Sequence, residues 1–402
     1  MPIRFRALLL AGALILQAST ALAEPVTLDD ALARGREISP RVTRAEAELR
    51  AAEARALQAG LRPNPEIGVQ VENFSGTGPY RTFRQSEVTV AVSQEFELGG
   101  ERRARKTVAG AQLEFARLSL RRAVADLTYD IAVAHAELRA AEDRAVLARS
   151  NLARAQELAR IAGTLVDTGR DPPLRKLRAD ALLAEAEAEA LRSFGLLLTA
   201  RRKLGLLIGS DDPELSAVGG DPIPTAPLPP NVASLDERIA AAERDAANAR
   251  IALARAEAVP NVTASGGFRN FRESGSTAFV LGVSVPLPIN RSVRSGVPAA
   301  RAEGEAAEAV LAQTRLDTRF SRQEAQTMLS AADERLAALT GPGLRQAIEA
   351  ERVAGIGYRA GKFSLLELID AQEALTNTRL KIIEAQLDRA RALAALARAN
   401  AQ

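Results

Sequence analysis

The apolar and polar positions of this chain follow two alternating patterns. Long alanine-rich stretches carry apolar residues at helix-face spacing, such as Leu368, Ile369 and Leu375 within residues 364–399, which predicts amphipathic helices. Four short runs instead alternate apolar with polar or small residues, which predicts strands with one apolar face. These runs lie at about residues 65–73, 87–96, 261–269 and 278–287.

The same order of elements occurs twice. Pro63-Asn64 recurs as Pro260-Asn261, and Asn73-Phe74 recurs at the same offset as Asn270-Phe271. A duplication explains this pairing. Two strands per copy make only four per chain, too few to close a sheet, so we expect the strands to need other chains. The predicted organisation is a first repeat at residues 24–210, a proline-rich linker at 211–233 and a second repeat at 234–402.

The amino terminus has the pattern of a secretory signal. Arg4 and Arg6 precede a short apolar run, and Ala21-Leu22-Ala23 follows it. This predicts a signal peptide at residues 1–23, cleaved after Ala23, and export of the chain. No later stretch approaches the roughly 20 apolar residues of a spanning helix, so any membrane insertion must use the strands. Their length suits this, because a tilted spanning strand needs about 9 to 11 residues.

Alternation alone is equally typical of half-buried strands in soluble proteins. The aromatic residues favour membrane strands, because seven of the fourteen fall in the two strand regions, as interfacial girdles require. They are Phe74, Tyr80, Phe83, Phe96, Phe268, Phe271 and Phe279.

The predicted helices are unusually long. A first one begins at an N-cap, Thr27, and runs to about Leu61; helical patterns of roughly 60 residues then span 101–163 and 295–355, about 90 Å each at 1.5 Å per residue. We expect both of the longest helices to be interrupted at matching places, Ser150-Asn151 and Gly341-Pro342-Gly343.

Each of these helices is followed by a returning helix, predicted at residues 174–207 and 364–399. Antiparallel coiled coils follow from this arrangement. Their tip turns are expected at Gly169 and Gly361.

Composition argues against nucleic-acid binding and catalysis. The 53 basic and 50 acidic residues are interspersed along the helices, which is typical of solvated faces. There is no cysteine, the single histidine is His135 and the only mature methionine is Met328, so we predict no metal site, no cofactor and no enzyme activity. An exported enzyme stays the weaker alternative because carboxylates are abundant.

Two motifs resemble a known family. The first is Gln94-Glu95-Phe96-Glu97-Leu98-Gly99-Gly100-Glu101-Arg102, and the second is Tyr358-Arg359-Ala360-Gly361 leading into Leu368-Ile369-Asp370-Ala371-Gln372. With the duplicated plan, they resemble the TolC-like outer membrane efflux family over essentially the whole mature chain. The first motif is most similar to outer membrane components of cobalt-zinc-cadmium type heavy-metal efflux systems.

The resemblance implies a mainly α fold with a small β part. It implies a homotrimer in which four strands per chain form a 12-stranded β-barrel in outer membrane lipid, continued by a periplasmic α-helical tunnel. The implied partners are a periplasmic adaptor and an inner membrane resistance-nodulation-division pump. The function would be a passive conduit for divalent heavy-metal cations. Efflux of organic compounds and a periplasmic coiled-coil scaffold are the alternatives.

The resemblance also points to residues at the second tip. Glu367 and Asp370 match positions where the family carries an acidic ring around its periplasmic aperture; the alternative is that they cap the helix and stay solvated. Arg175 and Arg178, at the matching positions of the first copy, are expected to pair with those acids across neighbouring coiled coils and to hold the aperture closed. Tyr358 is expected to add a hydrogen bond, as its family counterpart does. The chain departs from the family at Phe363, where an arginine is often found.

Overall fold

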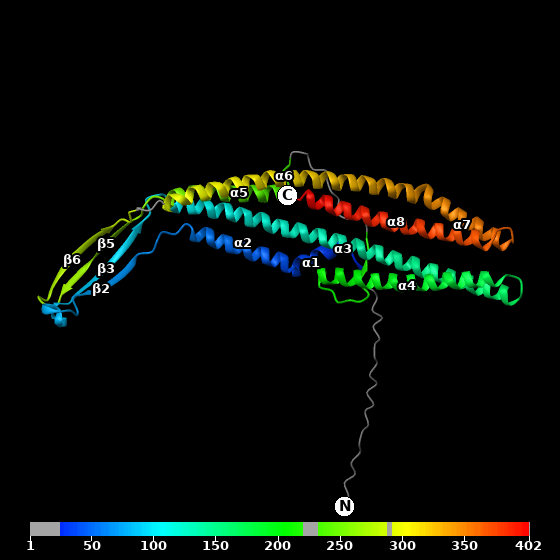
Figure 1. Ribbon diagram of the computed structural model, residues 1–402, viewed down its shortest axis with the longest axis horizontal. Helices are drawn as coiled ribbons and strands as arrows, with labels where there is room; N and C mark the ends of the chain where they lie inside the picture. The colour runs from blue at the N-terminus through cyan, green and yellow to red at the C-terminus, as the bar shows by residue number, and fades with distance from the viewer. Residues whose placement is uncertain (1–24, 220–231, 288–291, 402) are drawn as a thin grey trace, which may run out of the picture.

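The computed structural model describes residues 25–219, 232–287 and 292–401. It is a long, gently curved helical body with a sheet at one end (Figure 1). The predicted signal peptide at residues 1–23 and much of the proline-rich linker lie outside the described residues.

One hairpin from each repeat contributes to the sheet. Its antiparallel strand order is β2-β3-β5-β6, and the pairing of β3 with β5 joins the two repeats. The strands are β2 at Glu66–Glu72, β3 at Glu87–Phe96, β5 at Val262–Phe271 and β6 at Ser276–Ser284. Two 3₁₀ turns, Gly78–Arg81 and Phe83–Gln85, lie in the loop between β2 and β3.

The first repeat contains one helix break that the sequence interpretation missed. Thr27 caps α1 as predicted, with its side chain accepting from the Asp30 backbone. The helix expected to continue to Leu61 is broken at Ser39, because Pro40 lacks the N–H that a continuing helix needs, and Ser39 starts a new helix by accepting from Val42 N. The helices are α1 at Leu28–Ile38, α2 at Pro40–Gln58, α3 at Glu101–Asp167 and α4 at Pro173–Ile208.

The break expected at Ser150-Asn151 is wrong, since α3 continues through it for 67 residues. Asn151 instead faces another helix, where its Oδ1 accepts hydrogen bonds from Arg154 and from Thr376 Oγ1, the latter at 3.2 Å. A half-buried polar side chain that bonds across two helices can fix their register. The polar pair Ser150-Asn151 therefore marks a contact between two helices and not the end of a helix.

The expected interruption in the second repeat is a widened turn. Leu339–Gly343 forms a π-helical turn between α6 and α7, where the helical path bends but does not reverse (Figure 1). Pro342 cannot donate to the helical ladder, and such a turn accommodates the missing bond. The helices are α5 at Leu235–Glu257, α6 at Ser292–Ala338, α7 at Leu344–Arg359 and α8 at Leu365–Ala399.

The largest apolar core lies at the middle of the helical body. Ile131, Leu138 and Leu204 are fully buried there. This core includes a small parallel sheet that the sequence analysis did not predict, in which β1 at Pro25–Val26 pairs with β4 at Ser216–Ala217. The start of the first repeat and the start of the predicted linker are thus held together within the core.

Two α3 side chains secure this small sheet. His135 Nε2 lies 3.1 Å from Val26 O, and Arg139 Nη1 donates to Gly219 O at 2.6 Å. His135 is 4% exposed, so its ring is packed inside the helical body. Among the described residues, no helix has an apolar stretch long enough to cross a membrane.

Gly267 is expected to be essential to the contact between β3 and β5. A Cβ at Gly267 would lie 2.2 Å from Val90 O and 2.7 Å from Ala91 Cβ, whereas one at Gly68 would meet nothing within 4 Å. Both glycines oppose Ala91 in the same row of the sheet. We expect Gly267→Ala to destabilise the sheet by about 1–3 kcal/mol through overpacking. Gly68→Ala is the matched control; equal thermal midpoints for both variants would contradict the close approach.

His135 should make stability depend on pH. Burial lowers its pKa, only partly offset by the hydrogen bond to Val26. The unfolded state then binds more protons than the folded state below about pH 6.5. Stability should therefore fall as the pH drops from about 6.5 to the folded pKa, by roughly 1.4 kcal/mol for each unit between them. Unfolding measured at pH 7.5 and 5.5 should show a larger loss for the wild type than for His135→Gln.

Candidate functional sites: the sheet, the helical tips and an inter-helical groove

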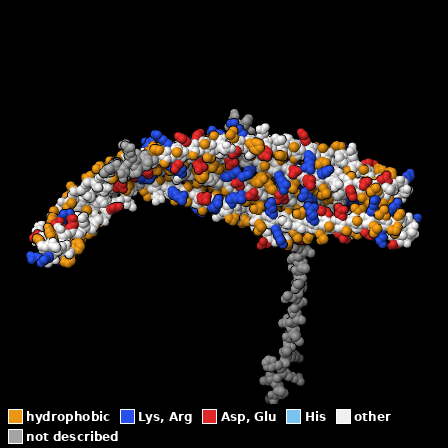
Figure 2. Space-filling model, in the orientation of Figure 1, with side chains coloured by type: hydrophobic (Ala, Val, Ile, Leu, Met, Phe, Trp, Pro, Cys, Tyr) orange, Lys and Arg blue, Asp and Glu red, His pale blue; other side chains and the backbone are white. Residues whose placement is uncertain are grey.

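One face of the sheet is apolar and uncovered. The register places Val69, Val90, Phe268 and Phe279 in one row across the four strands. Phe268 and Phe279 pack edge to face with ring centroids 5.5 Å apart, yet each is 62% exposed. Figure 2 shows charged side chains crowding the helical body, while the sheet carries mainly uncharged surface. Exposed apolar surface of this extent marks a region that contacts another protein or a lipid.

The opposite face is polar and holds an ion-pair cluster. Arg269 of β5 contacts both Glu72 of β2 and Glu87 of β3 at 3.0 Å. Its Nε donates to Thr89 Oγ1 at 2.9 Å. The sequence analysis missed this cluster, because only the register of three strands brings the four residues together.

Both tip turns lie where they were expected. Gly169 and Gly361 have φ values of 72° and 70°, a conformation that glycine adopts without strain. The next backbone N–H in each turn closes the helix end, Arg170 N to Leu165 O at 2.8 Å and Lys362 N to Gly357 O at 2.9 Å. This is the usual glycine-based helix termination.

Glu367 belongs to a capping box at the start of α8. Its Oε2 accepts from Ser364 N at 2.6 Å, while Ser364 Oγ accepts from Glu367 N. The hydrogen bond from the Ser364 backbone lowers the pKa of Glu367, so this exposed carboxyl carries its charge. Asp370 lies one turn farther along, also exposed. Glu367 thus caps its helix and presents its charge at the tip, and the carboxyl of Asp370 lies on the same exposed helix start.

Within one chain, the basic residues at the first tip do not contact these acids. Arg175 pairs with Asp171, one helical turn away. Arg178 is exposed and has no ion pair within the described part of the chain. The pairing of Arg175 and Arg178 with Glu367 and Asp370 therefore stays a prediction about neighbouring chains. Asp171 was missed, although its spacing from Arg175 is the usual one for a helical ion pair.

Tyr358 connects the two tips. It packs against a buried cluster that contains Leu158 and Ala162 of α3 together with Leu365 and Ile369 of α8. Burial raises the pKa of Tyr358, and the negative charge of Asp171 raises it further. Its hydroxyl thus lies in the field of the Asp171–Arg175 pair of the other coiled coil. The packing of Tyr358 against α3 and its interaction with Asp171 thus couple the two coiled coils within one chain.

Phe363 fills a notch in the second tip. A Cβ at Gly357 would lie 2.1 Å from Phe363 Cδ2, so the ring fits only because position 357 has no side chain. Packing of an aromatic ring replaces the charge that an arginine would bring here.

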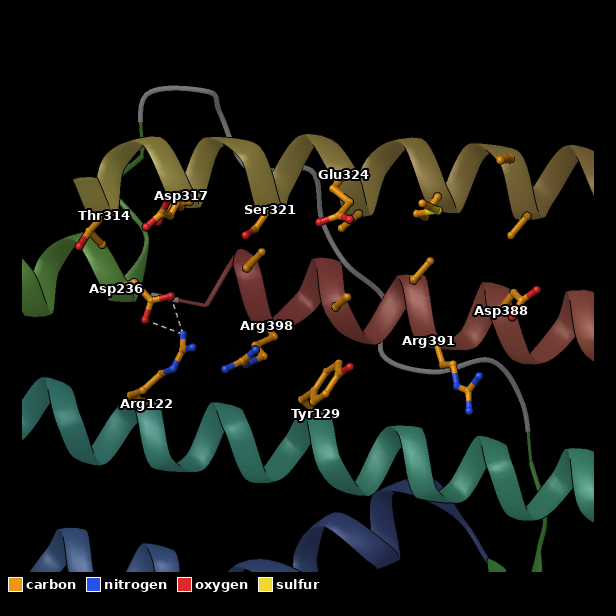
Figure 3. Close-up of a pocket in the computed structure, with 18 of the residues that line it drawn as sticks. Arg122, Tyr129, Asp236, Thr314, Asp317, Ser321, Glu324, Asp388, Arg391 and Arg398 are labelled. Carbon is orange, nitrogen blue, oxygen red and sulfur yellow. Dashed lines mark hydrogen bonds and ion pairs between the residues drawn. The ribbon is translucent and has the colours of Figure 1, made fainter. Parts of the chain in front are cut away.

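A groove of about 920 Å³ runs along the body between α3, α6 and α8. In Figure 3, Asp317, Ser321 and Glu324 lie on α6, whereas Arg398 and Arg391 of α8 point towards α3. Much of its charge is paired: Arg122 lies 2.7 Å from Asp236, and Arg398 is positioned over the Tyr129 ring. No group of histidine or carboxylate ligands suited to a metal ion occurs among the described residues. The groove is thus a surface lined by acidic and basic side chains.

Comparison with protein families identifies the chain. The model of the outer membrane efflux protein family matches residues 29–210 and 234–402. The chain belongs to this family. The resemblance inferred from the sequence is thereby confirmed, and the family consists of channel proteins of the outer membrane.

Curated relatives of this outer membrane efflux protein include three metal-resistance proteins. The nickel and cobalt resistance protein CnrC of Cupriavidus metallidurans is 35% identical over 317 residues, covering 78% of this chain and 75% of the relative. The nickel-cobalt-cadmium resistance protein NccC of Alcaligenes xylosoxydans xylosoxydans is 34% identical over 400 residues, 98% and 90% of the two chains. The cobalt-zinc-cadmium resistance protein CzcC of Cupriavidus metallidurans is 29% identical over 371 residues, 90% and 86%.

Solved structures support the fold. The outer membrane protein VceC of Vibrio cholerae superimposes with a TM-score of 0.79 at 21% identity, covering 93% of this chain and 96% of that one. CusC gives a TM-score of 0.80 at 17% identity, with 93% and 92% covered. The mostly helical architecture with few strands is thus that of TolC-like channels.

The tip contacts lead to a prediction about Tyr358. Asp171→Asn removes the negative charge that raises the Tyr358 pKa and leaves the Arg175 charge that lowers it. We therefore expect a lower pKa for Tyr358, measured by ultraviolet titration in a background where Tyr80 and Tyr129 are phenylalanine. Asp180→Asn, an exposed acid on α4 without an ion pair in the described residues, is the control. An unchanged titration in Asp171→Asn would show that the two tips are not electrostatically coupled.

Proposed function

We propose that this outer membrane efflux protein is the passive outer membrane conduit of a tripartite system that exports divalent heavy-metal cations. The observation that carries the proposal is the four-stranded sheet with one uncovered apolar face. Its two outer strands, β2 and β6, each have one unpaired edge within the chain. Strand edges cannot stay unpaired in lipid, so a spanning sheet must close.

Closure by three copies accounts for these edges. Three four-stranded sheets give the 12-stranded barrel of a homotrimer, in which β2 of one copy pairs with β6 of the next. The apolar row then faces outer membrane lipid and the polar face lines the duct, as in other membrane barrels. A soluble coiled-coil scaffold would have no use for a sheet of this kind.

The helices would continue the duct into the periplasm. α3 alone has 67 residues, about 100 Å of helix at 1.5 Å per residue. The tips at Gly169 and Gly361 would form the periplasmic aperture, where an adaptor and an inner membrane resistance-nodulation-division pump connect. Glu367 and Asp370 from three chains would form its acidic ring, and Arg175, Arg178 and Tyr358 would hold it closed.

The metal cargo is supported by the relatives, whose names specify nickel, cobalt, cadmium and zinc resistance. The described part of the chain is consistent with a passive role, because no metal-ligand cluster occurs in it. A conduit should bind its cargo weakly, since tight binding slows release. Selection of the ion would then belong to the pump.

Growth assays test the cargo. We expect a deletion strain to be sensitive to cobalt, zinc, cadmium or nickel and to be rescued by the gene, with unchanged tolerance of dyes and antibiotics. Sensitivity confined to organic compounds would keep the conduit but contradict the metal cargo. The absence of any phenotype in the strain, together with no conductance by the purified protein, would contradict the conduit.

The acidic ring is tested by ion selectivity. Glu367→Gln retains an oxygen that can accept from Ser364 N, so that variant combined with Asp370→Asn should remove charge but keep the cap. We expect cation selectivity in planar bilayers to fall severalfold, because rings of carboxylates favour cations. Glu334→Gln, an exposed acid of α6 away from the tip, should leave selectivity unchanged. Equal reversal potentials for all three proteins would argue against the ring.

A further inference from the structure

The ion-pair cluster on the polar face of the sheet has the geometry of an occupied cation site. The side chain of Arg269 lies between Glu72 and Glu87, with Nη2 3.0 Å from Glu72 Oε2 and Nη1 3.0 Å from Glu87 Oε2. Thr89 Oγ1 accepts a third bond from the same guanidinium at 2.9 Å. Thr89 is 7% exposed, so this side of the cluster is closed to water.

Neighbouring amides keep both carboxylates directed at the arginine. Asn73 Nδ2 donates to Glu87 Oε1 at 3.1 Å, and Gln70 Nε2 donates to Glu72 Oε1 at 3.2 Å. In each glutamate, one oxygen is thus held by an amide while the other faces the guanidinium. The two free oxygens converge on one point, which Arg269 fills.

Without the guanidinium, this point would suit a divalent cation. Two carboxylates and a hydroxyl are oxygen ligands of the kind that hard and borderline divalent ions accept. Arg269 is the only basic residue on the polar face of strands β2, β3, β5 and β6, where Glu66 and Glu95 are further acids.

We propose that Arg269 is a built-in counter-ion that prevents Glu72 and Glu87 from binding the divalent cations that pass through the duct. This inference rests on the proposed function, because it requires that the polar face lines the conduit. The cluster lies at the end of the sheet next to the β2–β3 loop, the end away from the helices (Figure 1). Cations leaving the duct would therefore meet it last, where retention would slow release most.

Binding and conductance together test the proposal. The variants are Arg269→Gln, which removes the charge, and Arg269→Lys, which keeps a cation at the same point. Arg272→Gln is the matched control, because Arg272 is an exposed arginine at the same end of the sheet with no ion pair among the described residues. The probe is cobalt chloride.

In planar bilayers, about 1 mM Co²⁺ should reduce the conductance of Arg269→Gln by roughly two-fold or more, because an ion that binds tightly blocks a pore. The wild type, Arg269→Lys and Arg272→Gln should be unaffected. Adding Glu72→Gln and Glu87→Gln to Arg269→Gln should abolish the block. Insensitivity of Arg269→Gln, or an equal block of the wild type, would overturn the proposal.

Equilibrium dialysis of the purified full chain in detergent separates this inference from the conduit itself. Arg269→Gln should bind Co²⁺ at least about ten-fold more tightly than the wild type, as expected when two carboxylates lose a competing cation. If no protein conducts but this gain in binding is seen, the conduit fails and the counter-ion role of Arg269 in the cluster stands. If all proteins conduct and the gain is absent, the inference fails and the conduit stands.

Discussion

The pairing of β3 with β5 is the contact on which the rest of the architecture depends. It joins the hairpins of the two repeats into one sheet over ten residue pairs, from Glu87 with Phe271 to Phe96 with Val262. Because side chains alternate strictly along a strand, a shift of one residue would move the apolar row to the polar face. The close approach at Gly267 fixes the distance between the two strands, so the register and the apolar face are determined together.

In the helical body, very long helices must be kept aligned with one another. Its core is built mainly from alanine and leucine, and exposed ion pairs contribute only about 0 to 1 kcal/mol each. Specific contacts provide the alignment: Asn151 bonds to Thr376 between α3 and α8, and His135 holds β1 against α3. The π-helical turn at Pro342 lets the second long helix continue past a residue that would otherwise break it.

The charged residues at the tips already have contacts within their own chain. The carboxylate of Glu367 is already hydrogen-bonded to its own helix start, and Arg175 already has Asp171. A lock between neighbouring chains would have to replace or share these contacts. Ion pairs that are only partly buried differ little in free energy, so such an exchange would be readily reversible, as an aperture that opens and closes requires.

Local sequence patterns were sufficient for the four strands and for the turns at Gly169 and Gly361, while the resemblance of two motifs identified the family. These depend on periodicities and on glycine turns, which act within a few residues. The same patterns were misleading at Ser150-Asn151 and incomplete at Ser39-Pro40, because a polar residue in a helix can mark either an end or a contact. Only the tertiary structure decided the partner of Asn151, the β1–β4 pairing and the cluster around Arg269. Each of these joins residues that are distant in sequence, and their proximity follows from strand register and helix packing, which no local pattern encodes.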